Sequence, residues 1–170
     1  MKTTPLVVAL SVSVTLLFCN PPAQAQTGAT SIFQPVPSPN DNFNNGLQAA
    51  SFSSPTDIWA VGQATIHYDG TKWTAFKAPM INGDNTSFLG GVVDISPTLA
   101  WAGGTVGIGT ANPGQEIEQW NGTKWTAAQG PTFGANQQPS IKAMAATSAT
   151  DIWAIGDLLD NSIGQLYFLF

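Results

Sequence analysis

The most informative features of this sequence are the residue types that it has little of. Its 170 residues include no arginine, five lysines, one histidine and one cysteine, and 9% of them are charged. So few cations form no basic patch of the kind that binds nucleic acid, and they give no attraction to an anionic membrane surface. A single cysteine, Cys19, allows no disulfide within the chain, so the fold must be held together by its apolar core.

Residues 1–25 have the pattern of a secretory signal peptide. Lys2 supplies a positive charge, residues 6–18 form an uncharged apolar run, and Ala-Gln-Ala at 23–25 provides the small residues that a signal peptidase reads. The run is shorter than the roughly 20 apolar residues that span a bilayer. We therefore expect cleavage after residue 25 and a mature chain, 26–170, that is secreted or periplasmic and not attached to a membrane.

Cys19 leaves lipidation as an alternative. Phe18 stands immediately before it, where a lipobox carries Gly, Ala or Ser, so the secretory interpretation is favoured. Without residues 1–25 the chain has no cysteine, which excludes a thiol nucleophile and a thiolate metal site. Ten acidic residues against the four remaining lysines give the mature chain a net charge of about −6. Its length is sufficient for one domain.

What the sequence does contain is a repeat. Three 16-residue segments align without a gap: 47–62, 89–104 and 141–156. In each copy an aliphatic residue lies 12 positions before a tryptophan, and these tryptophans are Trp59, Trp101 and Trp153. Tandem copies at this distance indicate a structural unit repeated along the chain.

Each unit continues into a hairpin pattern. Residues 64–79 and 116–131 align, and each has an aromatic residue, then Asp-Gly or Asn-Gly, then Thr-Lys-Trp. These Gly-containing pairs accept the positive φ that tight hairpin turns require. A complete unit is therefore predicted to have four short strands, a to d. The predicted strands are a (47–53, 89–95, 141–147), b (57–62, 99–104, 151–156), c (65–68, 116–120, 164–169) and d (72–77, 124–128).

The predicted fold is all-β: a partial β-propeller of about three four-stranded antiparallel blades. Strand b is apolar on both faces, which requires a packed layer on each side. Four-stranded units of roughly 40–50 residues are typical of propeller blades. The blades are expected at about 47–79, 89–131 and 141–170, the last without an outer strand of its own. Residues 33–39 match the segments 73–79 and 125–131 and are predicted as an unpaired outer strand.

The segments DIWAVG (57–62), YDGTKW (68–73) and DIWAIG (151–156) resemble the repeats of exported bacterial β-propeller proteins, which are loosely grouped with kelch-like and neuraminidase-like repeats. The resemblance covers about 33–170 and is specific for blade architecture, not for function. Sialidases of these groups hold their substrate with an arginine cluster. The copper site of galactose oxidase uses two histidines and a tyrosine–cysteine crosslink. This chain has neither set of residues.

The sequence predicts no catalytic residue, no cofactor and no metal site. His67, the only histidine, is expected to contact a neighbouring blade or solvent. Residues 40–46 begin like a calcium-binding loop, but Phe52 occupies the place of the acidic ligand at position twelve. Glu116 and Glu118 share a strand face, and we expect them on a solvated rim and not as the carboxyl pair of a glycosidase.

Aromatic residues supply the candidate binding positions. The regular placement of tryptophans on strand b (Trp59, Trp101 and Trp153) and on strand d (Trp73 and Trp125) predicts that they fill the layers between blades. Tyr68 and Trp120, which lie beside the hairpin turns, are expected to be more exposed. They are the two candidate ligand-binding residues, for a protein or a carbohydrate ligand.

These observations predict a non-catalytic exported β-propeller module for protein or glycan binding or scaffolding. Three blades are fewer than the four to eight of natural propellers, so we expect the chain to be a piece of a larger propeller. An oligomer that builds a ring from copies of the chain is a second possibility. The functional alternative is part of a glycosidase-like propeller hydrolase or lyase whose active site lies outside this chain. Open end blades predict self-association, with 164–170 as the main contact.

Overall fold

A computed structural model of the protein describes residues 37, 39, 46–79, 87–107, 113–134 and 136–169. The predicted signal peptide at 1–25, with Cys19, lies outside these residues. So does most of the outer strand predicted for 33–39 and of the polar segment 40–46. The chain divides into two units, and all the strands belong to the second, Val36–Phe170.

The described residues form eleven strands and no helix. The strands are β1 (Leu47–Ser54), β2 (Asp57–Gly62), β3 (Thr65–Tyr68), β4 (Trp73–Phe76), β5 (Ser87–Ser96), β6 (Leu99–Val106), β7 (Gly114–Trp120), β8 (Trp125–Ala127), β9 (Gln137–Ser148), β10 (Asp151–Asp160) and β11 (Gly164–Leu169). The predicted strand positions are therefore confirmed, with β5, β9 and β10 longer than expected.

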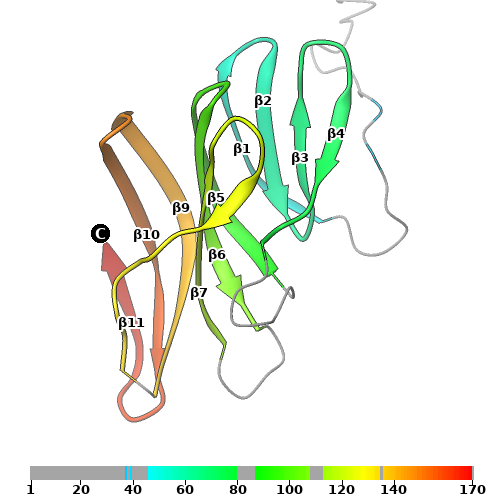
Figure 1. Cartoon of the computed structure of the whole chain (residues 1–170). Helices are drawn as coiled ribbons and strands as arrows, with labels where there is room; N and C mark the ends of the chain where they lie inside the picture. Colours follow the sequence, from blue (N-terminus) through cyan, green and yellow to red (C-terminus); the bar gives the residue numbers. More distant parts are fainter. Residues whose placement is uncertain are drawn as a thin grey trace, which may run out of the picture. The chain divides into compact units, whose positions relative to one another are not determined.

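The strands form three consecutive antiparallel sheets, each following the order of the chain. Sheet 1 is β1-β2-β3-β4, sheet 2 is β5-β6-β7-β8, and sheet 3 has three strands, β9-β10-β11. Figure 1 shows sheet 2 between the other two, with the first strands β1, β5 and β9 making the closest contacts between sheets. This is a partial β-propeller of three blades. Within the described residues the third blade has three strands and no outer strand, as the sequence predicted.

The hairpin between the third and fourth strands of a sheet follows directly from the sequence. Gly70 has φ of 90° and Gly122 has φ of 88°, a region that favours glycine. The Asp69 carboxylate accepts hydrogen bonds from the backbone N–H groups of Thr71 and Lys72. Asn121 does the same in sheet 2. The repeated phrase with Asp-Gly or Asn-Gly therefore encodes a turn and carries no chemistry of its own.

Close packing between sheets 2 and 3 depends on a glycine. A Cβ on Gly91 of β5 would lie 2.8 Å from the backbone carbonyl carbon of Ala143 in β9, closer than real Cβ atoms approach. The backbones of the two first strands therefore meet at a point where only glycine fits.

The layer between sheets 1 and 2 is filled by aromatic rings. Trp59 of β2 is completely buried, and its ring centroid lies 4.9 Å from those of both Trp120 and Trp125 of sheet 2. His67 stacks on Trp59 at 4.4 Å, and Phe76 closes the cluster at 5.3 Å. The predicted role of Trp59 as core between blades is confirmed. Aliphatic residues complete this layer: Val61, Leu89, Val92, Ala100 and Ala102.

Candidate functional site

The layer between sheets 2 and 3 is built at the same repeat positions but is less completely filled. Trp101 takes the place of Trp59 and packs near Ile117 and Ile141. In the aligned hairpins, Gln119 stands where sheet 1 has His67, and Ala128 stands where it has Phe76. Two rings that cover Trp59 are therefore replaced by an amide and a methyl group, which leaves unfilled space beside Trp101.

Sheet 3 also contributes less to this layer than sheet 2 contributes to the first. In sheet 2 the third strand places Trp120 opposite Ala100, so that its ring reaches Trp59. In sheet 3 the described part of β11 ends where Leu169 pairs with Ile155. No residue of β11 within the described part of the chain lies beside Ile152, the equivalent of Ala100.

The result is an open groove of about 430 Å³ between sheets 2 and 3. Its size falls within the range of ligand-binding pockets, roughly 300–1,000 Å³. Its wall is mainly apolar, with Met144 as an adaptable side chain and Gln129 and Thr150 as polar groups. The lining residues are Trp101, Ile117, Gln129, Gly130, Pro131, Met144, Thr150, Ile152 and Ala154.

One rim of the groove is held in place by hydrogen bonds. The N–H of Ala128 donates to the carbonyl of Ile117 at 2.8 Å, and the Gln115 side-chain amide donates to the carbonyl of Pro131 at 2.7 Å. A Cβ on Gly130 would lie 2.3 Å from Nε2 of Gln115, so the segment passes directly over that amide. The rim is therefore preorganised, which lowers the entropic cost of binding.

The groove is lined by apolar groups and by neutral groups that can form hydrogen bonds. None of the nine lining residues carries a titratable side chain, so the groove offers no general acid or base. The indole Nε1 of Trp101 is buried and has no hydrogen-bond partner among the described residues. The groove can take up an apolar group, with amide and hydroxyl groups available at its margin.

A polar cluster lies at the opposite side of sheet 2, in the layer with sheet 1. Nε2 of His67 lies 2.6 Å from Oδ1 of Asp57, and the Ser53 hydroxyl donates to Oδ2 of the same carboxylate. The aspartate thus lies between serine and histidine. A Ser-His-Asp triad needs the histidine in the middle, so this cluster is not arranged to activate the serine. His67 was expected to contact a neighbouring blade or solvent; its ring stacks on Trp59 of its own sheet, in the layer between sheets 1 and 2.

Asp94 of β5 joins this cluster across the layer. Its carboxylate accepts a hydrogen bond from the N–H of Ser53 at 2.9 Å, and its own N–H donates to the Ser51 hydroxyl at 2.9 Å. Burial, together with the nearby charge of Asp57, raises the pKa of Asp94 to about 6. These hydrogen bonds join β1 to β5 and stabilise the contact between sheets 1 and 2.

The expectation that Glu116 and Glu118 lie on a solvated rim is wrong. Both side chains are completely buried, with 0% exposure, on the face of β7 that packs against sheet 1. Burial first, and then the hydrogen bond and charge of Glu116, raise the pKa of Glu118 far above its ordinary value, so this carboxyl holds a proton at neutral pH. The Ser87 hydroxyl donates to Glu116 at 2.6 Å. A glycosidase pair must reach its substrate, and these carboxyls do not reach the surface.

The two aromatic residues chosen from the sequence have different environments. Trp120 was expected to be exposed, which is wrong: it is 5% exposed, and its indole N–H donates to the carbonyl of Pro97 at 3.1 Å. It is buried because it covers Trp59. Tyr68 is half-buried, donates its hydroxyl to the carbonyl of Gly70 and lies 5.4 Å from the Trp73 ring. The two residues lie in different sheets and do not form one site.

The third repeated tryptophan departs from the expectation for its position. Trp153 was predicted to be core between blades, but 49% of it is exposed. The reason is that no further sheet among the described residues covers this face of sheet 3. Its indole N–H donates to Asp151 at 2.9 Å, so its polar edge is satisfied.

The described residues contain neither a cluster of metal-ligating side chains nor a membrane-spanning helix. Nowhere within 46–79, 87–107, 113–134 or 136–169 do three or more His, Cys, Asp or Glu side chains gather as metal ligands would. The same part of the chain has no helix long and apolar enough to cross a membrane.

Comparison with known proteins gives no family for this chain. No protein-family profile and no curated protein matches it. One solved structure, "YCF48 bound to D1 peptide", is similar over 71% of this chain and 38% of its own length, at 13% identity and a TM-score of 0.46. This chain thus spans less than half of that protein. At this level of similarity neither fold nor ligand is carried over, and both rest on the residues described above.

The groove was not among the sites predicted from the sequence. Its signal was present in the repeat, since Gln119 and Ala128 replace two aromatic residues of the first copy. A search for positions where one copy loses volume would have pointed to the space beside Trp101. Met144, Ile152 and Gln129 carry no signal of their own, because their role depends on the packing of sheet 3 against sheet 2.

Proposed function

We propose that this chain is a non-catalytic β-propeller module that binds an apolar segment of a protein partner in the groove between sheets 2 and 3. The observation that carries the proposal is the groove itself: about 430 Å³, with a preorganised rim and no titratable lining residue. A module that binds or scaffolds needs such a surface and needs no reactive group.

The lining favours a protein ligand over a glycan. Met144, Ile152 and Ala154 form an aliphatic wall opposite Trp101. Such a wall matches the side chain of Ile, Leu or Phe, whereas a sugar presents many hydroxyl groups that need partners when they are buried. Gln129 and Thr150 can bond to the backbone on either side of an inserted side chain.

Export is part of the same proposal and rests on residues 1–25. Their charge, apolar run and small residues support a cleaved secretory signal, which would place the mature chain outside the cytoplasm. Mass spectrometry of the chain from a periplasmic or culture fraction is expected to give an N-terminus at Gln26. A chain that keeps Met1 in the cytoplasm, or one that carries lipid on Cys19, would contradict this part.

The groove can be tested with labelled peptides. The probes are eight-residue peptides of Gly and Ser with one central Ile, Leu, Phe or Trp, and binding is measured by fluorescence polarisation. We expect the apolar peptides to bind and a peptide of Gly and Ser alone not to bind. Thr150→Trp places a large ring at the exposed margin of the groove and should weaken binding by about tenfold or more.

Thr123→Trp is the matched control, because Thr123 is exposed in the β7–β8 hairpin and does not line the groove. It should bind the peptides as the unchanged protein does. A glycan array is run in parallel with both variants. Absence of peptide binding up to millimolar concentration overturns the protein-binding proposal, and glycan binding that Thr150→Trp abolishes would replace the ligand class.

A further inference from the structure

Sheet 3 presents an apolar face whose equivalents in the other sheets are buried. Trp153, Ile155 and Leu159 of β10 are 49%, 50% and 43% exposed. Ala145 and Ala143 pair with the first two of them and are exposed on the same face. The equivalent faces, with Trp59 in sheet 1 and Trp101 in sheet 2, each pack against the next sheet. We refer to these five residues as the Trp153 face.

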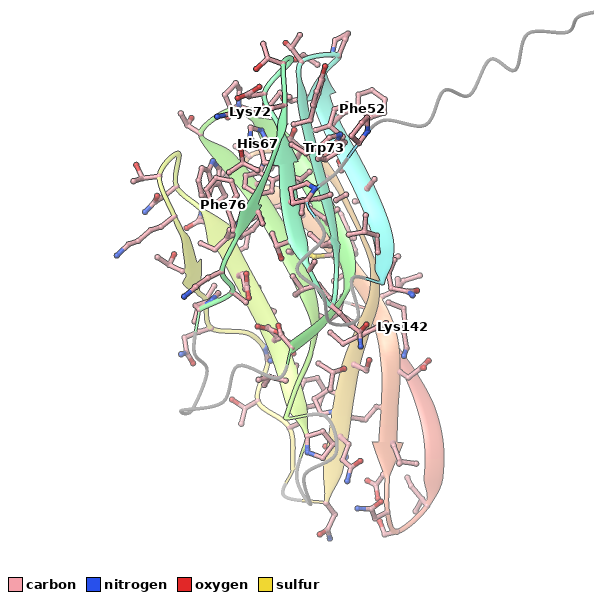
Figure 2. The ribbon with its side chains drawn as sticks, turned by 90° about the vertical axis from the view of Figure 1, so that its right-hand side faces the viewer. Phe52, His67, Lys72, Trp73, Phe76 and Lys142 are labelled. Carbon is pink, nitrogen blue, oxygen red and sulfur yellow. The ribbon has the colours of Figure 1, made fainter. Side chains whose placement is uncertain are left out.

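Sheet 1 presents a row of mostly aromatic side chains on the face that points away from sheet 2. Phe52, Ile58, Tyr68 and Trp73 are paired in register across the four strands, so their side chains share one face. Figure 2 shows Phe52 and Trp73 on the side of the sheet away from His67 and Phe76. Phe52 is 71% exposed, and the other three are half-buried. In the next row on this face, Ala60 and Ile66 are buried, whereas Ala50 and Ala75 are exposed. We refer to Phe52, Ile58, Tyr68 and Trp73 as the Tyr68–Trp73 row.

The Tyr68–Trp73 row is equivalent to the surface that receives Trp59 inside the protein. In sheet 2 the same positions are Asp94, Ala100, Trp120 and Trp125, also in register across four strands. Trp59 packs on the last two, whose ring centroids are 6.0 Å apart. Tyr68 and Trp73 form a similar pair at 5.4 Å. Sheet 1 therefore presents the kind of aromatic pair that receives a repeated tryptophan.

A second pair of positions on the two faces is also compatible. Between sheets 1 and 2, Ser51 faces Asp94 and the contact is polar. The residue equivalent to Ser51 in sheet 3 is Ala145, and the residue equivalent to Asp94 in sheet 1 is Phe52. At this position the contact would join an alanine with a phenylalanine, so Asp94 would have no counterpart that needs a polar partner.

We propose that the Trp153 face of one copy packs head to tail on the Tyr68–Trp73 row of a second copy, as sheet 1 packs on sheet 2. The contact is heterologous, since each copy contributes a different face. Two copies of three sheets bring six sheets together, which lies within the four to eight blades of natural propellers.

The proposal predicts complementation between two variants. Trp153→Lys disables one face and Phe52→Lys disables the other, and both side chains are exposed enough to be changed without loss of the fold. In sedimentation velocity experiments the unchanged chain should self-associate, and each variant alone should raise the apparent Kd by about 30-fold or more, the effect of losing one interface anchor. An equimolar mixture of the two variants should form a one-to-one complex, because each keeps the face that the other lacks.

Other modes of contact give different results. If two Trp153 faces met symmetrically, Phe52→Lys would associate like the unchanged chain and mixing would restore nothing. If the edge of β11 made the contact, both variants would still associate. A monomeric unchanged chain at millimolar concentration would also overturn the proposal. Ile155→Lys serves as a second change on the Trp153 face and must behave like Trp153→Lys. Thr150→Trp should leave association unchanged, which separates this contact from the groove.

Discussion

The two layers between sheets use equivalent positions and differ in how completely they are filled. In the first, Trp59 is enclosed by Trp120, Trp125, His67 and Phe76. In the second, Trp101 faces an open groove. The comparison shows that the repeat fixes the position of a tryptophan on the second strand, while its surroundings are set by residues that vary between copies.

The difference also separates stability from binding. A fully packed layer contributes the most apolar burial and leaves no room for a ligand. A partly filled layer contributes less burial and leaves an apolar surface to which a ligand can bind. The first layer therefore supports the fold, and the second carries the candidate site.

The largest expected effect comes from emptying the filled layer. Trp59→Ala removes a completely buried ring and should lower the free energy of unfolding by about 3–5 kcal/mol. Trp101→Ala should cost about 2 kcal/mol, because part of that ring already faces the groove. Urea denaturation followed by circular dichroism compares the two variants. Equal losses would mean that the layers are equally packed.

A change of opposite sign is expected at Glu118. In the folded protein the pKa of Glu118 is raised far above its usual value of 4.5, so the carboxyl keeps its proton at neutral pH. In the unfolded chain the same carboxyl is ionised at neutral pH. The contribution of the Glu118 proton to stability should therefore be complete below about pH 4.5 and be lost as the pH rises. Glu118→Gln should raise the free energy of unfolding at pH 7 by about 1–3 kcal/mol. It should have little effect at pH 4, which serves as the control. A loss of stability at pH 7 would show that the charged form is favoured.

Asp94 should produce a smaller effect in a lower pH range. Its pKa is raised from 3.8 to about 6, so the stability that its proton provides is complete below pH 3.8 and is lost as the pH rises to 6. Asp94→Asn keeps an oxygen that can accept from the Ser53 N–H. We expect it to flatten the dependence of stability on pH between 4 and 6, by about 1 kcal/mol. An unchanged slope would assign that dependence to another group.

The smallest effect is expected at the surface of sheet 3. Nζ of Lys142 lies 3.5 Å from Oδ2 of Asp157, and the lysine side chain is 53% exposed. Figure 2 shows Lys142 far from His67 and Phe76, which belong to the filled layer. Exposed pairs of this kind contribute about 0–1 kcal/mol. Lys142→Ala should change the midpoint of urea denaturation by no more than its experimental error, and a larger change would reveal a role in packing.

Much of the fold could be predicted from the repeat. Strand positions and hairpin turns follow from local patterns such as Asp69-Gly70, and these are confirmed. The burial of Glu116 and Glu118 could not be predicted in this way. Alternation shows that they share a face but does not show whether that face meets solvent or another sheet, and in this protein the face packs against sheet 1.

The groove was harder to predict because it exists where large side chains are missing, and not because particular residues are present. Tyr68 and Trp120 were chosen for being aromatic and near a turn, but Trp120 is needed to cover Trp59. The groove arises where Trp101 has no such cover. A list of residue types cannot show this, since it depends on which side chains of two sheets meet.

The most direct test of this account is the exposure of the three repeated tryptophans to water. The chain is labelled with 5-fluorotryptophan, each ¹⁹F resonance is assigned by a Trp→Phe change, and the shift between H₂O and D₂O is measured at a concentration where the chain is monomeric. We predict no solvent shift for Trp59, an intermediate shift for Trp101 and the largest for Trp153. A Trp101 resonance as protected as that of Trp59 would contradict the open groove, and a protected Trp153 in the monomer would contradict the exposed face of sheet 3.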